Sequence, residues 1–169
     1  MLILKAKKPN CSGIVLLIGL LSLTVSSFAS AQRQILPGNI CRPESSGQFT
    51  YSDGQIKNTG SHSRYIQCPI ASLPDYTDID FVQVFYHDGN PSRSVSCAFE
   101  MCVPQGTKVY SESASSGDAF IGSDELGFTV DFNFGRWTTM QYLRCRLPGY
   151  DPSLKGSDYS SIKTILVEY

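Results

Sequence analysis

Apolar and polar residues alternate over short segments of this chain, as residues 95–103 illustrate with an apolar side chain at every second position. That period is typical of a β-strand with one buried face. Eight segments rich in Val, Ile, Phe, Tyr and Thr are predicted as strands: 47–51, 64–70, 79–87, 94–103, 107–113, 127–134, 140–147 and 162–169. No stretch after residue 31 keeps a helical period over three turns. The pattern therefore predicts an all-β protein, an antiparallel two-sheet β-sandwich of jelly-roll type.

One turn signal predicts how two of these strands connect. Asp88-Gly89 lies between segments 79–87 and 94–103, and this dipeptide is typical of a β-hairpin. We therefore expect the two segments to pair directly. The first of them also carries Phe81 and Phe85 on the face opposite its other apolar residues. A central strand with a covered outer face is the simplest interpretation, and a ligand groove is the alternative.

The N-terminal residues follow a different pattern. Three lysines precede an uncharged apolar run, residues 14–25, which is the layout of a signal peptide. The run is shorter than the roughly 20 residues of a transmembrane helix, so we expect no retained membrane anchor. The small residues 29–31 predict cleavage between Ala31 and Gln32. We thus expect a signal peptide, 1–31, and one β-sandwich domain, 32–169, that is secreted or periplasmic.

Charge and motifs exclude several function classes. Loss of the signal peptide removes three of 14 basic residues, which leaves 11 against 15 acidic ones and a net charge of −4. This balance argues against a nucleic-acid partner. The chain has no Gly-x-Ser-x-Gly, phosphate-loop or dinucleotide motif. His62 and His87 are its two histidines, and both are interpreted as surface residues. A histidine within hydrogen-bond reach of a Ser or Cys in a cleft would make hydrolysis a candidate function again.

Acidic residues and cysteines are the candidate metal ligands and catalytic groups of the chain. Asp78 with Asp80, or Asp124-Glu125, offer paired carboxylates for a glycosidase, and Asp75 adds an oxygen ligand for calcium. None of these sets has the full spacing of such a site. The cysteines show no Cys-x-x-Cys spacing that would indicate zinc. We therefore expect no metal, no cofactor and no enzymatic activity.

Five cysteines remain after the predicted signal peptide. An exported chain keeps its disulfides, and an odd number leaves one thiol free. Alternation places Cys97 and Cys145 on the inward faces of their strands, whereas Cys102 points outward. Cys68 also faces inward, and Cys41 has no other obvious partner. We predict the bridges Cys41–Cys68 and Cys97–Cys145, each worth roughly 3.5 to 4 kcal/mol in the chain-entropy model, and a free Cys102.

Short motifs follow one another along the predicted domain. They are Ile40-Cys41-Arg42-Pro43, Cys68-Pro69, Phe81-Val82-Gln83-Val84 followed by Asp88, Ser94-Val95-Ser96-Cys97, the run from Tyr142 to Pro148, and the closing segment 162–169. Their order resembles a group of small secreted bacterial proteins of unknown function. The resemblance covers nearly all of residues 32–169 and implies a β-sandwich with the same two cysteine pairs. It names no activity or catalytic residue, and Cys102 departs from its pattern.

The segment 140–147 offers the expected ligand surface. Alternation turns Tyr142, Arg144 and Arg146 outward, and Trp137 lies just before them. Aromatic platforms and arginine forks bind sugars and anionic groups, whereas a solvated strand face and a core tryptophan are the plainer interpretation. We expect a non-catalytic binding or adhesion-like module for glycans or other envelope components. A concave surface shared with the residues around Phe85 would identify its site.

A structural envelope protein is the alternative function. The last strand alternates up to the terminal aromatic Tyr169, as the closing strands of outer-membrane barrels do. Most predicted strands are shorter than the roughly ten residues of such barrels, and the faces that carry cysteines indicate a closed core. A barrel and a hydrolase therefore rank below the binding module and the structural protein.

Overall fold

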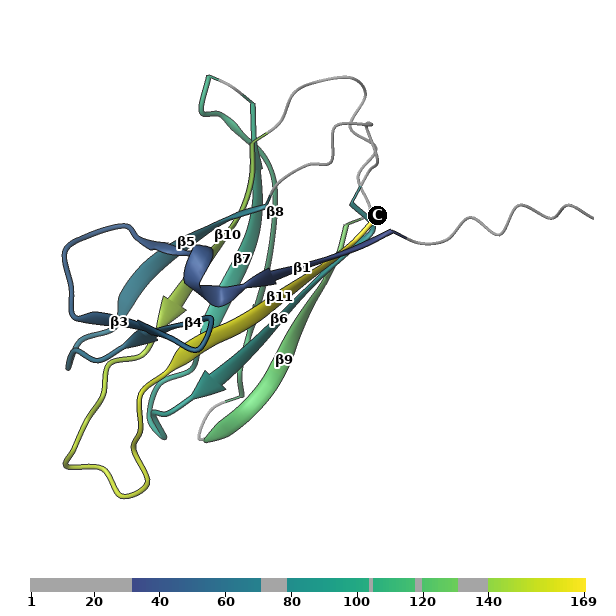
Figure 1. Cartoon of the computed structure of the whole chain (residues 1–169). Helices are drawn as coiled ribbons and strands as arrows, with labels where there is room; N and C mark the ends of the chain where they lie inside the picture. Colours follow the sequence, from purple (N-terminus) through teal and green to yellow (C-terminus); the bar gives the residue numbers. More distant parts are fainter. Residues whose placement is uncertain (1–31, 71–78, 104, 118–119, 131–139) are drawn as a thin grey trace, which may run out of the picture. The chain divides into compact units, whose positions relative to one another are not determined.

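The computed structural model describes residues 32–70, 79–103, 105–117, 120–130 and 140–169. These residues form eleven strands and one 3-10 turn (Figure 1). In chain order the elements are β1 (Arg33–Pro37), η2 (Gly38–Ile40), β2 (Arg42–Pro43), β3 (Phe49–Ser52), β4 (Gln55–Asn58), β5 (Arg64–Ile70), β6 (Phe81–Asp88), β7 (Ser96–Cys102), β8 (Lys108–Ser115), β9 (Gly122–Thr129), β10 (Met140–Leu147) and β11 (Ser161–Glu168). The predicted signal peptide, Asp75, Asp78 and Trp137 lie outside the described residues.

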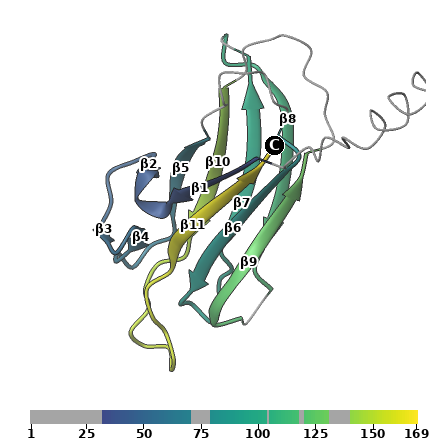
Figure 2. The same cartoon turned by 45° about the vertical axis from the view of Figure 1, so that its right-hand side comes forward.

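The strands form two antiparallel sheets, whose layers can be followed in Figures 1 and 2. Sheet A has the order β3-β4-β11-β6-β9, with β1 also paired to β11, and sheet B has the order β2-β5-β10-β7-β8. From β4 to β11 the chain changes sheet at every connection except that between β7 and β8. Such alternation is the jelly-roll arrangement of a β-sandwich, so the predicted fold class is confirmed. In the part of the chain that the structure describes, no helix is long and apolar enough to cross a membrane.

The inner faces of the two sheets make one hydrophobic core. Val82, Val84 and Tyr86 of β6 face Phe99 and other residues of sheet B, and all four named residues are nearly or fully buried. Their neighbours on β6 point to the outer face, as the alternating burial of this strand shows. Strand β6 lies between β11 and β9, which confirms that it is a central strand.

Both predicted disulfides, Cys41–Cys68 and Cys97–Cys145, are present in this core. Cys97 and Cys145 lie directly opposite each other on β7 and β10, with both side chains turned inward as alternation predicts. Cys102 is free and lies on the outer side of sheet B, but it is only 7% exposed. The expectation of a free thiol is confirmed, although neighbouring side chains cover it.

Strand positions differ from prediction mainly at the sheet edges. β1, β2 and β4 were not expected, because they are short or carry no clear alternation; Ile35 in β1 is 70% exposed. β9 begins at Gly122, five residues before the predicted segment 127–134. Its first half is polar because β9 is an edge strand that exposes those residues to solvent. A polar segment at a sheet edge shows no alternation of apolar residues, so the sequence pattern does not predict it as a strand.

The predicted hairpin at Asp88-Gly89 is wrong. β6 belongs to sheet A and β7 to sheet B, so the chain crosses between the layers at this point. The Asp88 carboxylate accepts hydrogen bonds from the backbone N–H groups of Asn90 and Val95, at 3.1 and 2.9 Å. Gly89 packs against the loop before β11, and a Cβ there would lie 2.2 Å from the carbonyl oxygen of Asp158. The glycine is thus needed for close packing and not for a tight turn.

Candidate functional site

The outer face of sheet B carries the three strand residues selected from the sequence. Strand pairing places Arg144 between Gln67 of β5 and Ala98 of β7. Two residues further along β10, Arg146 is opposite Tyr65 and Ser96. Two residues before Arg144, Tyr142 is opposite Pro69 and Glu100. Tyr142, Arg144 and Arg146 therefore share one face, as alternation predicts. We call this surface the sheet-B face.

Phe85 does not share a surface with Tyr142 and Arg144. Phe85 lies on β6 in sheet A, between the core residues Val84 and Tyr86, so its ring points to the outer side of that sheet. The hydrophobic core separates it from Arg144. Sequence alternation gives the face of each strand within its own sheet, but it does not give the sheet to which the strand belongs.

Arg144 is the centre of the sheet-B face. Its Nε and Nη2 atoms donate to the two carboxylate oxygens of Glu44 at 2.6 and 2.8 Å, and its guanidinium carbon lies 4.4 Å from the centre of the Tyr65 ring. The hydrogen bonds with Glu44 raise the pKa of the guanidinium, which stays charged. Bidentate pairing and ring stacking both fix the orientation of the side chain. The Tyr65 ring, 44% exposed, is consequently held in one position at the surface.

A second cluster lies beside it around the buried carboxylate of Glu100. Lys108 Nζ donates to one oxygen of Glu100 at 2.5 Å, and the Tyr142 hydroxyl donates to the other at 2.8 Å. Burial by itself would raise the pKa of Glu100, but these two hydrogen bonds together with the positive charges of Lys108 and Arg144 outweigh it and hold the pKa below its usual value. Cys102 Sγ lies 3.5 Å from the Tyr142 oxygen, and this contact, with burial, raises the pKa of the phenol. The Tyr142 side chain is thus held in place, and its hydroxyl already donates its hydrogen bond to Glu100.

The Glu100 cluster predicts a pH-dependent stability. Because the pKa of Glu100 is lowered on folding, its contribution is complete above the usual value of about 4.5 and is lost as the pH falls through the lower, folded value. We expect Glu100→Gln to be less stable than wild type at neutral pH and to approach it in acid. Urea unfolding at several pH values between about 3 and 7 measures this difference. Lys108→Met should remove most of the pH dependence of stability that Glu100 causes. A stability difference between wild type and Glu100→Gln that stays constant with pH would contradict the role given to Glu100.

The other half of the sheet-B face has short side chains. Strands β7 and β8 contribute five small residues to it, four of them with hydroxyl groups: Ser96, Ala98, Ser111, Ser113 and Ser115. Among the described residues, Arg146 makes no ion pair or side-chain hydrogen bond, although it lies at the border between the two halves. An exposed ring, an uncommitted guanidinium and several hydroxyls thus lie side by side.

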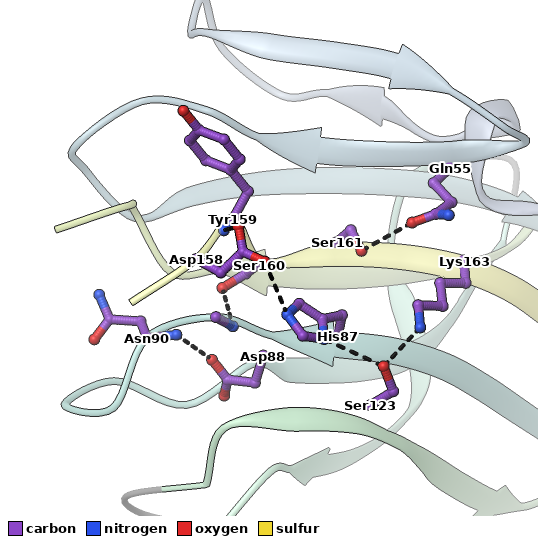
Figure 3. A network of polar contacts seen from close by, with 11 residues as sticks. Gln55, His87, Asp88, Asn90, Ser123, Asp158, Tyr159, Ser160, Ser161 and Lys163 are labelled. Carbon is purple, nitrogen blue, oxygen red and sulfur yellow. Dashed lines mark hydrogen bonds and ion pairs between the residues drawn. The ribbon is translucent and has the colours of Figure 1, made fainter. Parts of the chain in front are cut away.

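A separate polar network lies on the outer face of sheet A (Figure 3). His87 Nδ1 is 3.2 Å from Ser123 Oγ, and His87 Nε2 is 3.6 Å from Asp158 Oδ2. Lys163 Nζ donates to the same Ser123 oxygen at 2.6 Å. The other histidine, His62, contacts the hydroxyl of its sequence neighbour at 3.0 Å. Neither serine nor aspartate of the His87 network was selected from the sequence, since both are distant in the chain and belong to no motif.

Metal-ligating side chains do not gather in the described ranges: no three His, Cys, Asp or Glu residues are placed to hold an ion together. Asp124 and Glu125, a candidate catalytic pair in the sequence, follow each other on β9 and so point to opposite faces of the strand. Two carboxylates on opposite faces do not flank one glycosidic bond.

Comparison with known proteins gives no family. No family model matches the chain, and no curated protein matches it. Among solved structures, it is similar to a low-affinity xylan-binding module, CBM86, from Roseburia intestinalis, with 8% identity, a TM-score of 0.49, and coverage of 81% of this chain and 95% of that one. It is also similar to a mutant of the carbohydrate-binding module CBM29-2, with 11% identity, a TM-score of 0.46, and coverage of 82% and 86%. A family 35 carbohydrate-binding module from Clostridium thermocellum shows 14% identity, a TM-score of 0.41, and coverage of 81% and 98%.

Proposed function

We propose that this chain is a glycan-binding module that works outside the cytoplasm, and that its sheet-B face binds the ligand and takes no part in catalysis. The observation that carries the proposal is the arrangement of Arg144, clamped by Glu44 and stacked on the exposed ring of Tyr65. The two disulfides support an oxidising compartment such as the periplasm or the cell exterior.

Sugars fit the chemistry of this face. A sugar ring presents C–H groups on its flat side and hydroxyl groups around its rim, so it is best matched by an aromatic surface next to hydrogen-bonding groups. Tyr65 offers the aromatic surface, and Arg146 offers guanidinium donors to ring or carboxylate oxygens. Serine hydroxyls such as Ser96 donate and accept, as sugar hydroxyls require.

Preorganisation favours binding over a purely structural role. Immobilising a mobile side chain costs roughly 0.5 to 1.5 kcal/mol on association. Glu44 has already fixed Arg144, and Glu100 has fixed Tyr142, before any ligand arrives. The face therefore binds with little further loss of conformational entropy.

A glycan array with the exported, oxidised protein tests the proposal, followed by calorimetric titration of any glycan that binds. Tyr65→Ala should weaken that binding at least tenfold, because an exposed aromatic anchor at the centre of a binding face carries a large share of the affinity. Arg146→Ala should weaken it as well, through loss of donors. Tyr159→Ala is the matched control, since Tyr159 is similarly exposed, at 38%, but lies in the loop before β11 in the other sheet.

Two outcomes would contradict the proposal in different ways. Unchanged affinity of the Tyr65→Ala variant would move the site away from the sheet-B face. No binding to any glycan, together with co-fractionation with membranes, would favour a structural envelope protein instead.

A further inference from the structure

The network around His87 has the layout of an activated nucleophile, and it lies on sheet A, away from the sheet-B face. Figure 3 shows His87 between Ser123 and Asp158, with Lys163 reaching the serine from the other side. Nucleophile, base and orienting carboxylate come from three separate parts of the chain, as in serine hydrolases of unrelated folds.

The fold fixes each member of the network. His87 of β6 and Ser123 of β9 are directly opposite in the strand pairing. Asp158 lies in the loop before β11, and its backbone N–H donates to the carbonyl of Gly89 at 2.6 Å. Gly89 comes two residues after His87 in the chain, so this contact holds Asp158 close to the imidazole. The two segments pack so closely here that Gly89 has no room for a Cβ.

Lys163 reaches the serine because β11 is irregular at this point. The register of β11 against β6 shifts between Ile162 and Thr164, which leaves Lys163 as the extra residue of a β-bulge. Bulges change the direction of a side chain and are frequent next to active sites. Here the bulge aims the lysine across β6 toward Ser123 on the far neighbouring strand.

One arrangement of the protons makes His87 a base for Ser123. Lys163 can only donate, so Ser123 Oγ accepts from it, and the serine proton is available to His87 Nδ1 in the tautomer that leaves this nitrogen unprotonated. The imidazole then carries its proton on Nε2, which is buried and makes no hydrogen bond within the described residues. Asp158 Oδ2, 3.6 Å from Nε2, is the acceptor that this proton faces. A contact of this length is expected to shorten when the imidazole becomes charged.

We propose that Ser123 is the nucleophile of an acyl-ester hydrolase activity, an activity beyond glycan binding and contrary to the expectation of a protein without catalysis. Ser123 Oγ attacks the ester carbonyl carbon while His87 Nδ1 takes the hydroxyl proton. The ester C–O bond breaks, the leaving alcohol oxygen takes that proton, and an acyl-serine remains. Water, deprotonated by His87, then releases the carboxylic acid and restores the serine.

The other two residues support this chemistry without forming bonds to the acyl group. The Lys163 ammonium beside Ser123 Oγ stabilises negative charge that develops on oxygen at the attack site. Asp158 is a positioning residue that stabilises the imidazolium formed when His87 accepts the proton. Ser123 is exposed, so esters of alcohols at the surface of a larger molecule can reach it as well as small esters.

The test uses the full chain, exported and oxidised, with p-nitrophenyl acetate as substrate. Ser123→Ala and His87→Gln should each lower the rate at least 100-fold, as expected for loss of a nucleophile or its base. Asp158→Asn should lower kcat and leave KM unchanged, a split that a merely structural role would not produce. Phenylmethylsulfonyl fluoride should add one sulfonyl group, and peptide mapping should place it on Ser123.

The chain contains its own control in a second serine–histidine contact. Ser61 Oγ lies 3.0 Å from His62 Nδ1, but among the described residues no carboxylate pairs with that imidazole. Ser61→Ala should keep full activity. The proposal is overturned if wild type is no faster than Ser123→Ala, or if the sulfonyl group is found on another residue. Glycan binding by the Ser123→Ala variant, measured in parallel, reports on folding and on the sheet-B face independently.

Discussion

Replacing both Cys97 and Cys145 with alanine is expected to lower the free energy of unfolding by about 4 kcal/mol, a large share of the stability of a domain of this size. The bridge spans 48 residues of sequence. In the chain-entropy model, releasing a loop of that length lets the unfolded chain gain conformational freedom, which stabilises the unfolded state. Urea unfolding of the oxidised wild type and of the double variant measures the difference.

The second disulfide and the free cysteine provide the comparison. Cys41–Cys68 spans 27 residues, so its removal should cost about 0.5 kcal/mol less than removal of the longer bridge. Cys102→Ala removes a buried sulfur but no cross-link, so it should cost far less than either. If removal of the shorter bridge proves more costly, contacts in the folded state and not loop closure determine the stabilisation.

The bridges could be predicted because strand alternation is a local property. Cys97 and Cys145 occupy inward positions of two segments whose alternation is clear over seven residues or more, and a disulfide then needs only that the strands be near neighbours. The same local signal identified most strands and the fold class. It failed at β9, whose polar first half at the sheet edge has no buried face to produce the pattern.

The partners of the site residues could not be predicted, because they depend on the order of strands in each sheet. Glu44, which clamps Arg144, lies 100 residues away in sequence, and Ser123 lies 36 residues from His87. Neither partner belongs to a motif. The sequence indicated that Arg144 points outward, but only the pairing of β10 with β5 brings Tyr65 beside it.

The incorrect hairpin at Asp88-Gly89 has the same origin. A dipeptide is a local signal, whereas the Asp88 side chain is used for a long-range contact: its Oδ2 accepts a hydrogen bond from Ser116 Oγ, 28 residues away, at 2.6 Å. Ser116 follows β8 of sheet B, so this bond ties the end of β6 to the other layer. The aspartate is part of the crossing between the sheets and not of a tight turn.

Asp88→Ala is therefore expected to be among the most destabilising single substitutions, at about 3 kcal/mol or more. Asp88 is fully buried, and its carboxylate accepts hydrogen bonds from the backbone of Asn90 and Val95 and from the Ser116 hydroxyl. Alanine would leave these three donors in the interior without acceptors, and each orphaned group costs roughly 1 to 3 kcal/mol. Asp88→Asn should cost less, since one of its oxygens remains.

Asp151 is the matched control for this substitution. Its carboxylate also accepts hydrogen bonds from a backbone N–H and a hydroxyl, both of Ser153, but it does so at an exposed position. Water can replace the carboxylate there, so Asp151→Ala should change the free energy of unfolding much less than Asp88→Ala in the same urea titration. Equal losses for the two variants would mean that the Asx-type hydrogen bonds within each loop carry the effect. A loss confined to Asp88→Ala, and reduced in a Ser116→Ala background, would show that the buried link between the two sheets carries it.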